Sequence, residues 1–242
     1  MSAMLSVSGL QKSFGAVVVA DATSFDIAKG EAVGILGPNG AGKTSLFNLI
    51  TGALRADDGS IVFDGADITS QSAAARCKMG IARSFQIPQP FGGMTVFENA
   101  MVGATQGAGM SGHEAEDHAL AVLDDTGLLA KANARADTLT LLERKRLELT
   151  RALAAKPKLL LLDEIAGGLT KAECKSLIET IQSIHKSGTT IVWIEHVVHA
   201  LLAVVERLIV IDFGKKIAEG EPKAIMQSPE VKEIYLGVDP DA

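Results

Sequence analysis

Residues 37 to 45, GPNGAGKTS, have the residue types and spacing of a loop that holds phosphate groups. The stretch directly follows the apolar run EAVGIL and opens a helical pattern, which is the context that such a loop requires. Glycines let backbone N–H groups close around phosphate oxygens, and the helix N-terminus adds partial positive charge. We expect Lys43 to reach the β- and γ-phosphates of a nucleotide, and the Thr44 hydroxyl to contact Mg²⁺. The predicted nucleotide-binding residues are Gly37, Pro38, Asn39, Gly40, Ala41, Gly42, Lys43, Thr44 and Ser45.

Two carboxylates supply what a phosphate loop still lacks, namely a second metal contact and a group that activates the attacking water. The four leucines at 159 to 162 predict a buried strand, and Asp163 and Glu164 follow at its end, where α/β folds gather ligands. We assign Asp163 to Mg²⁺ through water and Glu164 to the catalytic base. The alternatives are a plain connecting turn and an acidic pair that only begins the next loop, and the joint occurrence of both motifs disfavours them.

The elements that must position these residues can be predicted from hydrophobic patterns. Short apolar runs, typical of buried strands, occupy residues 31–36, 60–63, 159–162, 190–194 and 208–211. Helical patterns separate most of them, at 43–54 and at 171–188, where a glycine ends the second helix. This alternation predicts an α/β domain around a mostly parallel sheet. Between about Pro90 and Pro157 the strand signal stops and residues 113–136 read as helices, so we expect a helical insertion rather than an independent domain.

The composition is that of a folded globular protein, with 242 residues, 47% hydrophobic and 21% charged. A net charge of −6 gives no general attraction for nucleic acid, so DNA and RNA are not expected as ligands. The two cysteines, Cys77 and Cys174, show no metal-ligand spacing and are expected to be free thiols. No signal peptide and no apolar run of about 20 residues is evident, which predicts a cytosolic chain.

Three further motifs occur in a fixed order along the chain. RSFQIPQPF contains Gln86, VWIEH places His196 directly after a predicted strand, and QKSFG contains Phe14. Together with GPNGAGKT and LLLLDE, these motifs resemble those of the nucleotide-binding subunit of an ABC transporter, over essentially the whole chain. The other four histidines, at 113, 118, 185 and 199, are interpreted as surface or helix residues.

The resemblance implies a role for each of these residues. Gln86 would act near Mg²⁺ and the attacking water, in a loop that also joins the nucleotide core to the helical insertion. His196 would donate a hydrogen bond near the γ-phosphate, as a catalytic residue beside Gln86 and Glu164. Phe14 would stack on adenine, although a phenylalanine without this context is more often a core side chain. ATP and Mg²⁺ are the implied ligands.

The resemblance also implies the fold and the domain organisation. We expect a P-loop NTPase of the RecA-like α/β class, with a mostly parallel sheet core, an antiparallel β portion and an inserted α-helical subdomain. The whole chain, 1–242, would form one domain. Within it, residues 1–89 and 158–242 would form the nucleotide-binding core, and 90–157 the insertion that carries the signature helix.

Within the family, the chain is more similar to the ATP-binding subunits of branched-chain amino-acid importers. The similar segments are ARSFQIPQPFGGMTVFENAMVG, RKRLELTRAL, AGGLT, IEHVVHAL and the tail VKEIYLG. This similarity implies a peripheral ATPase on the cytoplasmic face of the inner membrane that imports small organic solutes. Its partners would be transmembrane permease subunits and a second copy of itself or a homologous subunit. A periplasmic or extracellular solute-binding protein would act with it indirectly.

The signature of the family departs from its usual Leu-Ser-Gly-Gly-Gln, which contacts the ATP held by the opposite subunit. The aligned residues here are Leu139, Thr140, Leu141, Leu142 and Glu143. Thr140 and Glu143 have the spacing of a capping box, so a helix N-terminus with its positive dipole end is expected. The negative charge of Glu143 could be offset by Arg144, Lys145 and Arg146. A competent variant signature and a purely structural helix start both remain open.

The loop after Glu164 also departs from the family pattern. Ile165 and Thr170 replace the usual proline and the aspartate of the D-loop, the segment through which paired subunits communicate, while Leu169 keeps the hydrophobic position. This departure puts communication between subunits in doubt, but leaves the hydrolytic residues in place.

Three other functions share part of this pattern. An exporter ATPase for lipid or lipopolysaccharide would carry nearly all the same motifs. A soluble ABC ATPase of translation or repair would usually show tandem cassettes or long coiled-coil insertions. A small-molecule P-loop kinase would not need Gln86, the insertion or His196.

Overall fold

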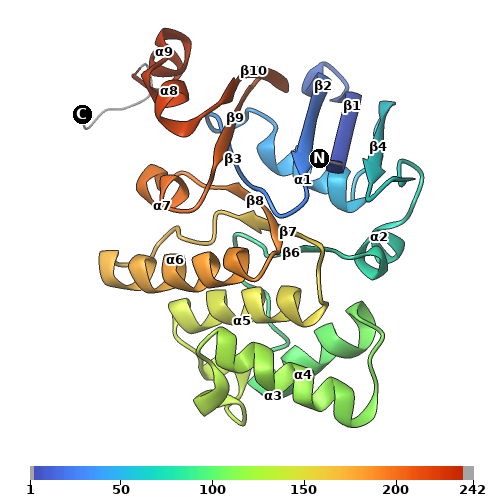
Figure 1. Cartoon of the computed structure of the whole chain (residues 1–242), viewed down its shortest axis with the longest axis vertical. Coiled ribbons are helices and arrows are strands. Elements are labelled where there is room, and N and C mark those ends of the chain that lie inside the picture. The colour runs from blue at the N-terminus through green and yellow to red at the C-terminus, as the bar shows by residue number, and fades with distance from the viewer. Residues whose placement is uncertain (1–2, 237–242) are drawn as a thin grey trace. The chain divides into compact units, whose positions relative to one another are not determined.

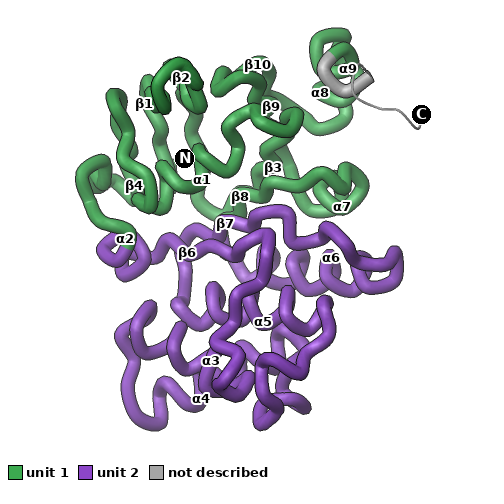
Figure 2. Tube along the Cα trace, turned by 180° about the vertical axis from the view of Figure 1, so that it is seen from behind, with its two compact units in different colours: residues 1–73, 190–242 green, residues 74–189 purple. Residues whose placement is uncertain are grey.

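The computed structural model describes residues 3–236 of the chain, whose fold is shown in Figure 1. The chain divides into two compact units, coloured separately in Figure 2. The first unit contains residues 1–73 and 190–242, and the second contains residues 74–189. Neither the glycine at the end of the VKEIYLG tail nor the residues after it lie within the described range.

The first unit contains parallel strands at the places that apolar runs predicted. β3 (Ala32–Leu36) pairs in parallel with β8 (Thr190–Ile194) and with β9 (Arg207–Asp212), and β10 (Lys215–Gly220) pairs antiparallel with β9. Every residue of β3 and β8 is buried, which explains why both read as unbroken apolar runs. The order β10-β9-β3-β8 places the end of β3 between two parallel neighbours.

An antiparallel sheet completes the first unit, in the order β2-β1-β4-β5. Its strands are β1 (Ala3–Phe14), β2 (Val17–Ala28), β4 (Asp58–Phe63) and β5 (Ala66–Asp67). β1 and β2 form a hairpin in which Phe14 pairs with Val17, and Gly15 adopts the positive φ of 60° that a two-residue turn requires. Of these strands, the apolar runs identified only part of β4. β1 and β2 were missed because they bury roughly alternate residues and therefore carry many polar side chains.

Within residues 3–236, the first unit contains the short helices α1 (Lys43–Thr51), α7 (Val198–Leu202), α8 (Pro222–Gln227) and α9 (Pro229–Leu236). The sequence predicted that the first of these continues to residue 54, and this prediction was wrong. Gly52 adopts the left-handed conformation, with φ 77°, and its N–H closes the last turn on the carbonyl of Leu49. Glycine ends a helix in this way because it has no Cβ to clash.

The second unit combines one parallel strand pair with helices. β6 (Ile81–Arg83) and β7 (Leu159–Asp163) pair in parallel. The helices are α2 (Ala73–Met79, whose first residue belongs to the first unit), α3 (Val96–Val102), α4 (Gly112–Asp125), α5 (Leu141–Ala154) and α6 (Lys171–Lys186), with a π-helical turn, η1 (Gly103–Gly107), and 3₁₀ turns η2 (Leu129–Lys131) and η3 (Ala136–Thr138). A core that includes Val96, Leu123, Leu139 and Leu147 holds α3, α4 and α5 together.

The predicted helical region from 113 to 136 is only partly helical. α4 covers its first half and ends at Asp125, and Gly127 then adopts a φ of 70°, which breaks the helix. The glycine predicted at the end of α6 is confirmed, since Gly188 has a φ of 97° and donates to the carbonyl of His185. Across residues 3–236, no helix has both the length and the hydropathy needed to cross a membrane.

Candidate functional site

The predicted phosphate loop joins β3 to α1 in the first unit and is glycine-rich for a steric reason. Gly40 and Gly42 have φ values of 83° and 98°. A Cβ at Gly42 would lie 2.2 Å from the carbonyl oxygen of Val19, so no other residue fits there without a shift of the backbone. No side chain caps the start of α1, where Thr44 is exposed. The helix N-terminus is therefore open to an anion.

Lys43 lies beneath this loop rather than out in solvent. Its side chain is buried, and Nζ donates to the carbonyl oxygens of Gly37 at 2.6 Å and Pro38 at 2.9 Å. A buried ammonium group in the curve of a glycine-rich loop provides a fixed positive charge for phosphate oxygens. The arrangement is suited to the ground-state binding of a nucleotide.

Phe14 ends β1 and is 53% exposed, so it is not a core side chain. The ammonium of Lys12 lies 5.3 Å from the ring centroid and is also bonded to Asp57 at 2.6 Å. An exposed aromatic ring at the end of a strand offers a flat surface to a purine base.

His196 follows β8, as the sequence predicted, and it is exposed. The adjacent Glu195 is buried, and its carboxylate accepts the N–H groups of His196 at 3.0 Å and Val197 at 3.3 Å. Those two bonds fix the backbone from which the His196 side chain projects. Glu195 was not identified from the sequence, because a glutamate at a strand end has no distinguishing pattern.

In the second unit, β7 carries Asp163 at its end, and Glu164 follows directly. Asp163 is buried and forms an ion pair with Arg83 of the neighbouring strand β6. Glu164 has a φ of 48°, a left-handed conformation that costs a residue other than glycine roughly 1–3 kcal/mol. Strain of this kind persists at functional sites where the surrounding structure enforces it.

Gln86 and Glu164 lie together, although 78 residues separate them in sequence. The side-chain amide of Gln86 donates through Nε2 to Oε2 of Glu164 at 2.6 Å. Of the residues proposed for catalysis, these two are both in the second unit, and the structure brings them into contact. A carboxylate and an amide in contact can jointly hold one water molecule between a base and an orienting group.

The groups assigned to Mg²⁺ are Thr44 in the first unit and Asp163 and Gln86 in the second. Hydroxyl, carboxylate and amide oxygens are the hard ligands that Mg²⁺ prefers, so each of these three groups is of a type that suits this ion. Among the described residues, no group of three or more His, Cys, Asp or Glu is placed to hold a metal ion. The ion pair with Arg83 favours a contact of Asp163 through water.

The signature segment, whose sequence departs from the usual one of the family, starts α5 with the predicted capping box. The Thr140 hydroxyl accepts the N–H of Glu143 at 3.4 Å, and the Glu143 carboxylate accepts the N–H of Thr140 at 2.9 Å. Leu139 is buried in the core, whereas Thr140 and Leu141 are exposed. The helix start is thus both well formed and accessible.

The expected compensation of Glu143 by the three following basic residues was wrong. Glu143 pairs instead with Lys131, at 2.5 Å, and the hydrogen bond from Lys131 is the main reason that the pKa of Glu143 is lowered. Arg144 donates to the carbonyls of Leu139 and Asp137. Arg146 donates to the Thr126 carbonyl and to Ser176, and Lys145 donates to the Glu164 carbonyl at 3.4 Å. Consecutive residues on a helix point in different directions, so they cannot all reach the first turn.

The two D-loop positions are part of the start of α6. Thr170 is its N-cap, and its hydroxyl accepts the Glu173 N–H at 3.3 Å while the Glu173 carboxylate accepts the Thr170 N–H at 2.8 Å. Leu169 directly precedes this cap and is partly buried. The threonine that replaces the usual aspartate therefore has a structural role of its own.

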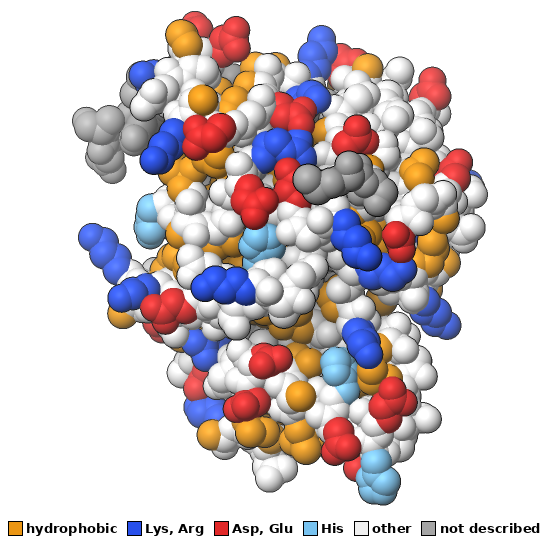
Figure 3. All heavy atoms as spheres, in the orientation of Figure 1, with side chains coloured by type: hydrophobic (Ala, Val, Ile, Leu, Met, Phe, Trp, Pro, Cys, Tyr) orange, Lys and Arg blue, Asp and Glu red, His pale blue; other side chains and the backbone are white. Residues whose placement is uncertain are grey.

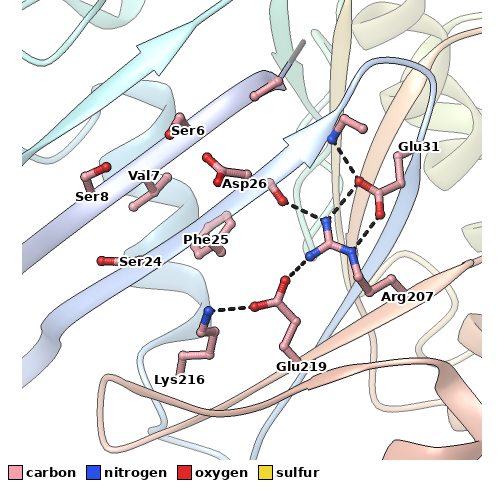
Figure 4. Close-up of a pocket in the computed structure, with 12 residues that line it drawn as sticks. Ser6, Val7, Ser8, Ser24, Phe25, Asp26, Glu31, Arg207, Lys216 and Glu219 are labelled. Carbon is pink, nitrogen blue, oxygen red and sulfur yellow. Dashed lines mark hydrogen bonds and ion pairs between the residues drawn. The ribbon is translucent and has the colours of Figure 1, made fainter. Parts of the chain in front are cut away.

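A separate hollow of about 680 Å³ lies in the first unit and is shown in Figure 4. Its charged side chains bond to one another. Arg207 donates to both carboxylate oxygens of Glu31, at 2.7 and 2.9 Å, and to Glu219, which also pairs with Lys216. Because the guanidinium also donates to the Asp26 carbonyl, its donor nitrogens are already engaged. These bonds tie the surrounding strands together, and we assign no ligand to the hollow.

Known proteins resemble this chain over nearly its full length. Residues 20–167 match the family described as ABC transporter, and residues 215–241 match the family described as branched-chain amino acid ATP-binding cassette transporter. The high-affinity branched-chain amino acid transport ATP-binding protein LivG of Escherichia coli K12 is 34% identical, over 97% of this chain and 98% of that protein. The lipopolysaccharide export system ATP-binding protein LptB of the same strain is also 34% identical, over 98% of both chains.

Among solved structures, the ADP conformation of MJ1267, an ATP-binding cassette of an ABC transporter, is similar to this fold. Its TM-score is 0.89 at 32% identity, and the match covers 98% of this chain and 100% of that chain.

Proposed function

This chain belongs to the ABC transporter family of ATP-binding subunits, and from that premise we propose that it powers the import of branched-chain amino acids or related small organic solutes. It is an ATPase subunit of a transporter. The direction of transport and the solute are the proposed part, because LivG and LptB are equally similar to it.

The match of residues 215–241 to the branched-chain amino acid family carries this proposal. That segment begins with β10 and continues through α8 and α9, outside the part of the chain that matches the general ABC transporter family. It therefore supports a subgroup within the family, whereas the phosphate loop and the acidic pair support only the family.

The proposed reaction is hydrolysis of ATP, with the adenine stacked on Phe14 and the phosphates held by the loop and Lys43. Glu164 takes the proton of the attacking water as general base. Gln86, which is bonded to Glu164, orients that water, and His196 donates a hydrogen bond to the γ-phosphate. Thr44, Gln86 and Asp163 would hold Mg²⁺, which when bound would supply positive charge against the phosphates. Thr140 and the start of α5 would contact the ATP of a partner subunit.

ABC ATPases work with membrane permeases and form dimers. The proposed partners here are transmembrane permease subunits, a second copy or a homologous subunit, and indirectly a solute-binding protein on the far side of the membrane. An apolar stretch in the second unit supports permease docking: Phe85, Ile87, Phe91 and Met94 expose between 40% and 70% of their surface. This assembly would place the subunit at the cytoplasmic face of the inner membrane, as a peripheral protein.

The proposed domain organisation is a single ABC ATPase domain. Its core would be residues 1–89 and 158–242, and its insertion residues 90–157.

A deletion strain complemented with the parent chain or with Glu164→Gln tests the proposal. Uptake of labelled leucine should be lost on deletion, should return with the parent chain, and should not return with the variant. Normal leucine uptake in the deletion strain, together with accumulation of lipopolysaccharide or lipid at the inner membrane, would instead identify an exporter.

A further inference from the structure

The second unit contains a cavity that the proposed ATPase site does not use. Its volume is about 240 Å³, and it is lined by the last turns of three helices. α4 contributes Val122 and Asp125, α5 contributes Leu153, and α6 contributes Ile184. Lys156, just beyond the end of α5, also lines it.

The walls of this cavity carry both signs of charge beside an apolar surface. Asp125 provides a carboxylate, and Lys156 provides an ammonium group. The ends of the three helices add partial negative charge, because the last carbonyl groups of a helix point outward from its C-terminus. His118 already bonds to one of these carbonyls, that of Ala154, at 3.1 Å. Val122, Leu153 and Ile184 form the apolar part of the lining.

The volume restricts the size of a ligand. A water molecule takes about 30 Å³ in the liquid, so 240 Å³ corresponds to about eight waters, which is room for a small organic molecule. A nucleotide is much larger and would bring negative charge to Asp125. A bare metal ion is disfavoured because the lining contains only one carboxylate.

We propose that this cavity binds an α-amino acid with an aliphatic side chain, such as leucine or valine. The ammonium group would bond to Asp125 at the negative ends of the helices, and the carboxylate would bond to Lys156. The side chain would lie against Val122, Leu153 and Ile184. Leucine and valine are small enough for this volume.

Such a ligand would act on the same helix that begins at the signature segment. α5 runs for 14 residues, about 21 Å, from the Thr140 cap to the cavity. A ligand bound between the last turns of α4, α5 and α6 would fix α5 at that end. That the ligand is the transported solute rests on the proposed function. Binding to the cavity, however, does not require that any transport occurs.

Calorimetric titration of the purified chain with L-leucine tests the proposal without a permease. We expect saturable binding at concentrations up to about 10 mM. Asp125→Asn and Lys156→Gln should each weaken the affinity at least tenfold, about 1.4 kcal/mol. Asp124→Asn is the matched control, since Asp124 is an exposed acid on the same helix that does not line the cavity, and it should bind like the parent. The melting temperature of each variant reports whether it remains folded.

Analogues separate the three features of the ligand. 3-Methylbutylamine lacks the carboxylate, 4-methyl-2-oxopentanoate lacks the ammonium group, and glycine lacks the aliphatic side chain, so each should bind at least tenfold more weakly than leucine. The proposal is overturned if leucine does not bind the parent chain, if any of the three analogues binds as tightly as leucine, or if the folded Asp125→Asn and Lys156→Gln variants bind like the parent. Since leucine uptake is measured independently, failure here leaves the proposed function standing.

Discussion

Among single residues, Asp163 depends on Arg83 to bury its charge. Both side chains are almost fully buried, and they form an ion pair between β7 and β6. Loss of one partner of a buried ion pair is costly, because the other charge keeps its desolvation penalty. Arg83 therefore positions the carboxylate that we assign to Mg²⁺.

Arg83→Ala should lower the free energy of unfolding by about 3–5 kcal/mol. Arg135→Ala is the control, because Arg135 forms an exposed ion pair with Asp137, and its loss should change the stability little. Urea denaturation of both variants measures the difference. Equal and small effects would show that the buried pair is not needed to hold Asp163.

Thr140 and Glu143 belong both to a helix cap and to the proposed contact with a partner's ATP. Thr140→Gly should cost only a few tenths of a kcal/mol as a cap, but should reduce ATPase activity roughly tenfold if the hydroxyl contacts ATP. Glu143→Gln should tighten ATP-dependent dimerisation, because it removes a negative charge near the γ-phosphate.

Melting temperature, ATPase rate and the ATP-induced dimer fraction, measured with the true partner subunit, distinguish the two readings of this segment. A structural helix start predicts that neither activity nor dimerisation changes in either variant. The capping box followed from sequence spacing alone, whereas Lys131, twelve positions before Glu143, did not. A partner beyond the next turn of a helix depends on tertiary packing, which local spacing does not report.

Among the helices, α5 ends in a conformation that disfavours the residue found there. Lys156 has a φ of 52° and donates its N–H to the carbonyl of Leu153 at 2.8 Å, one residue before Pro157. Glycine is the usual residue at such a position. The lysine at this position therefore makes the end of α5 less stable than a glycine would.

Lys156→Gly should raise the free energy of unfolding by about 0.5–1 kcal/mol, because relief of left-handed strain exceeds the entropy cost of glycine. Lys186→Gly, at the last helical position of α6, should do the opposite and destabilise by up to about 1 kcal/mol. Both are measured by chemical denaturation. Destabilisation by both changes would show that the Lys156 side chain contributes more than its backbone conformation costs.

The strands differ in how far their sequences predicted them. β3, β7, β8 and β9 are buried along nearly all of their length, and their unbroken apolar runs identified them. β1 and β2 have one solvent-facing side, so their alternating polar residues concealed them. The positions of Glu164 and Gln86 in sequence predicted their roles, but their mutual hydrogen bond and the ion pair of Asp163 required the packing of β6 beside β7.

For the protein as a whole, acidic and basic side chains are interspersed over the face shown in Figure 3. In the first unit, Arg207 on β9 joins the turn before β3 through Glu31 and joins β10 through Glu219. Burial raises the pKa of Glu31, but the bonds from Arg207 and the Ala28 N–H outweigh it, so the net pKa is lowered. The charged form of Glu31 therefore stabilises the fold.

A lowered pKa means that the stability from Glu31 is present above the unfolded value of 4.5 and is lost as the pH falls through the folded value below it. Glu31→Gln should be less stable than the parent at about pH 7, and the difference should shrink as the pH falls below about 4. Urea denaturation across this range measures it. A difference that stays constant with pH would contradict the assignment.

The central claim is that this chain hydrolyses ATP through Glu164. Its most direct test is to measure phosphate release from ATP, with Mg²⁺, for the parent chain and for Glu164→Gln. The variant should bind ATP with the affinity of the parent and accumulate as an ATP-bound dimer, because glutamine keeps the size and polarity but cannot accept the proton. Its rate should fall by about 10²–10⁴-fold, while Glu179→Gln, an exposed glutamate on α6, should keep the parent rate. Phosphate release by Glu164→Gln within about twofold of the parent would place the base elsewhere and contradict the mechanism.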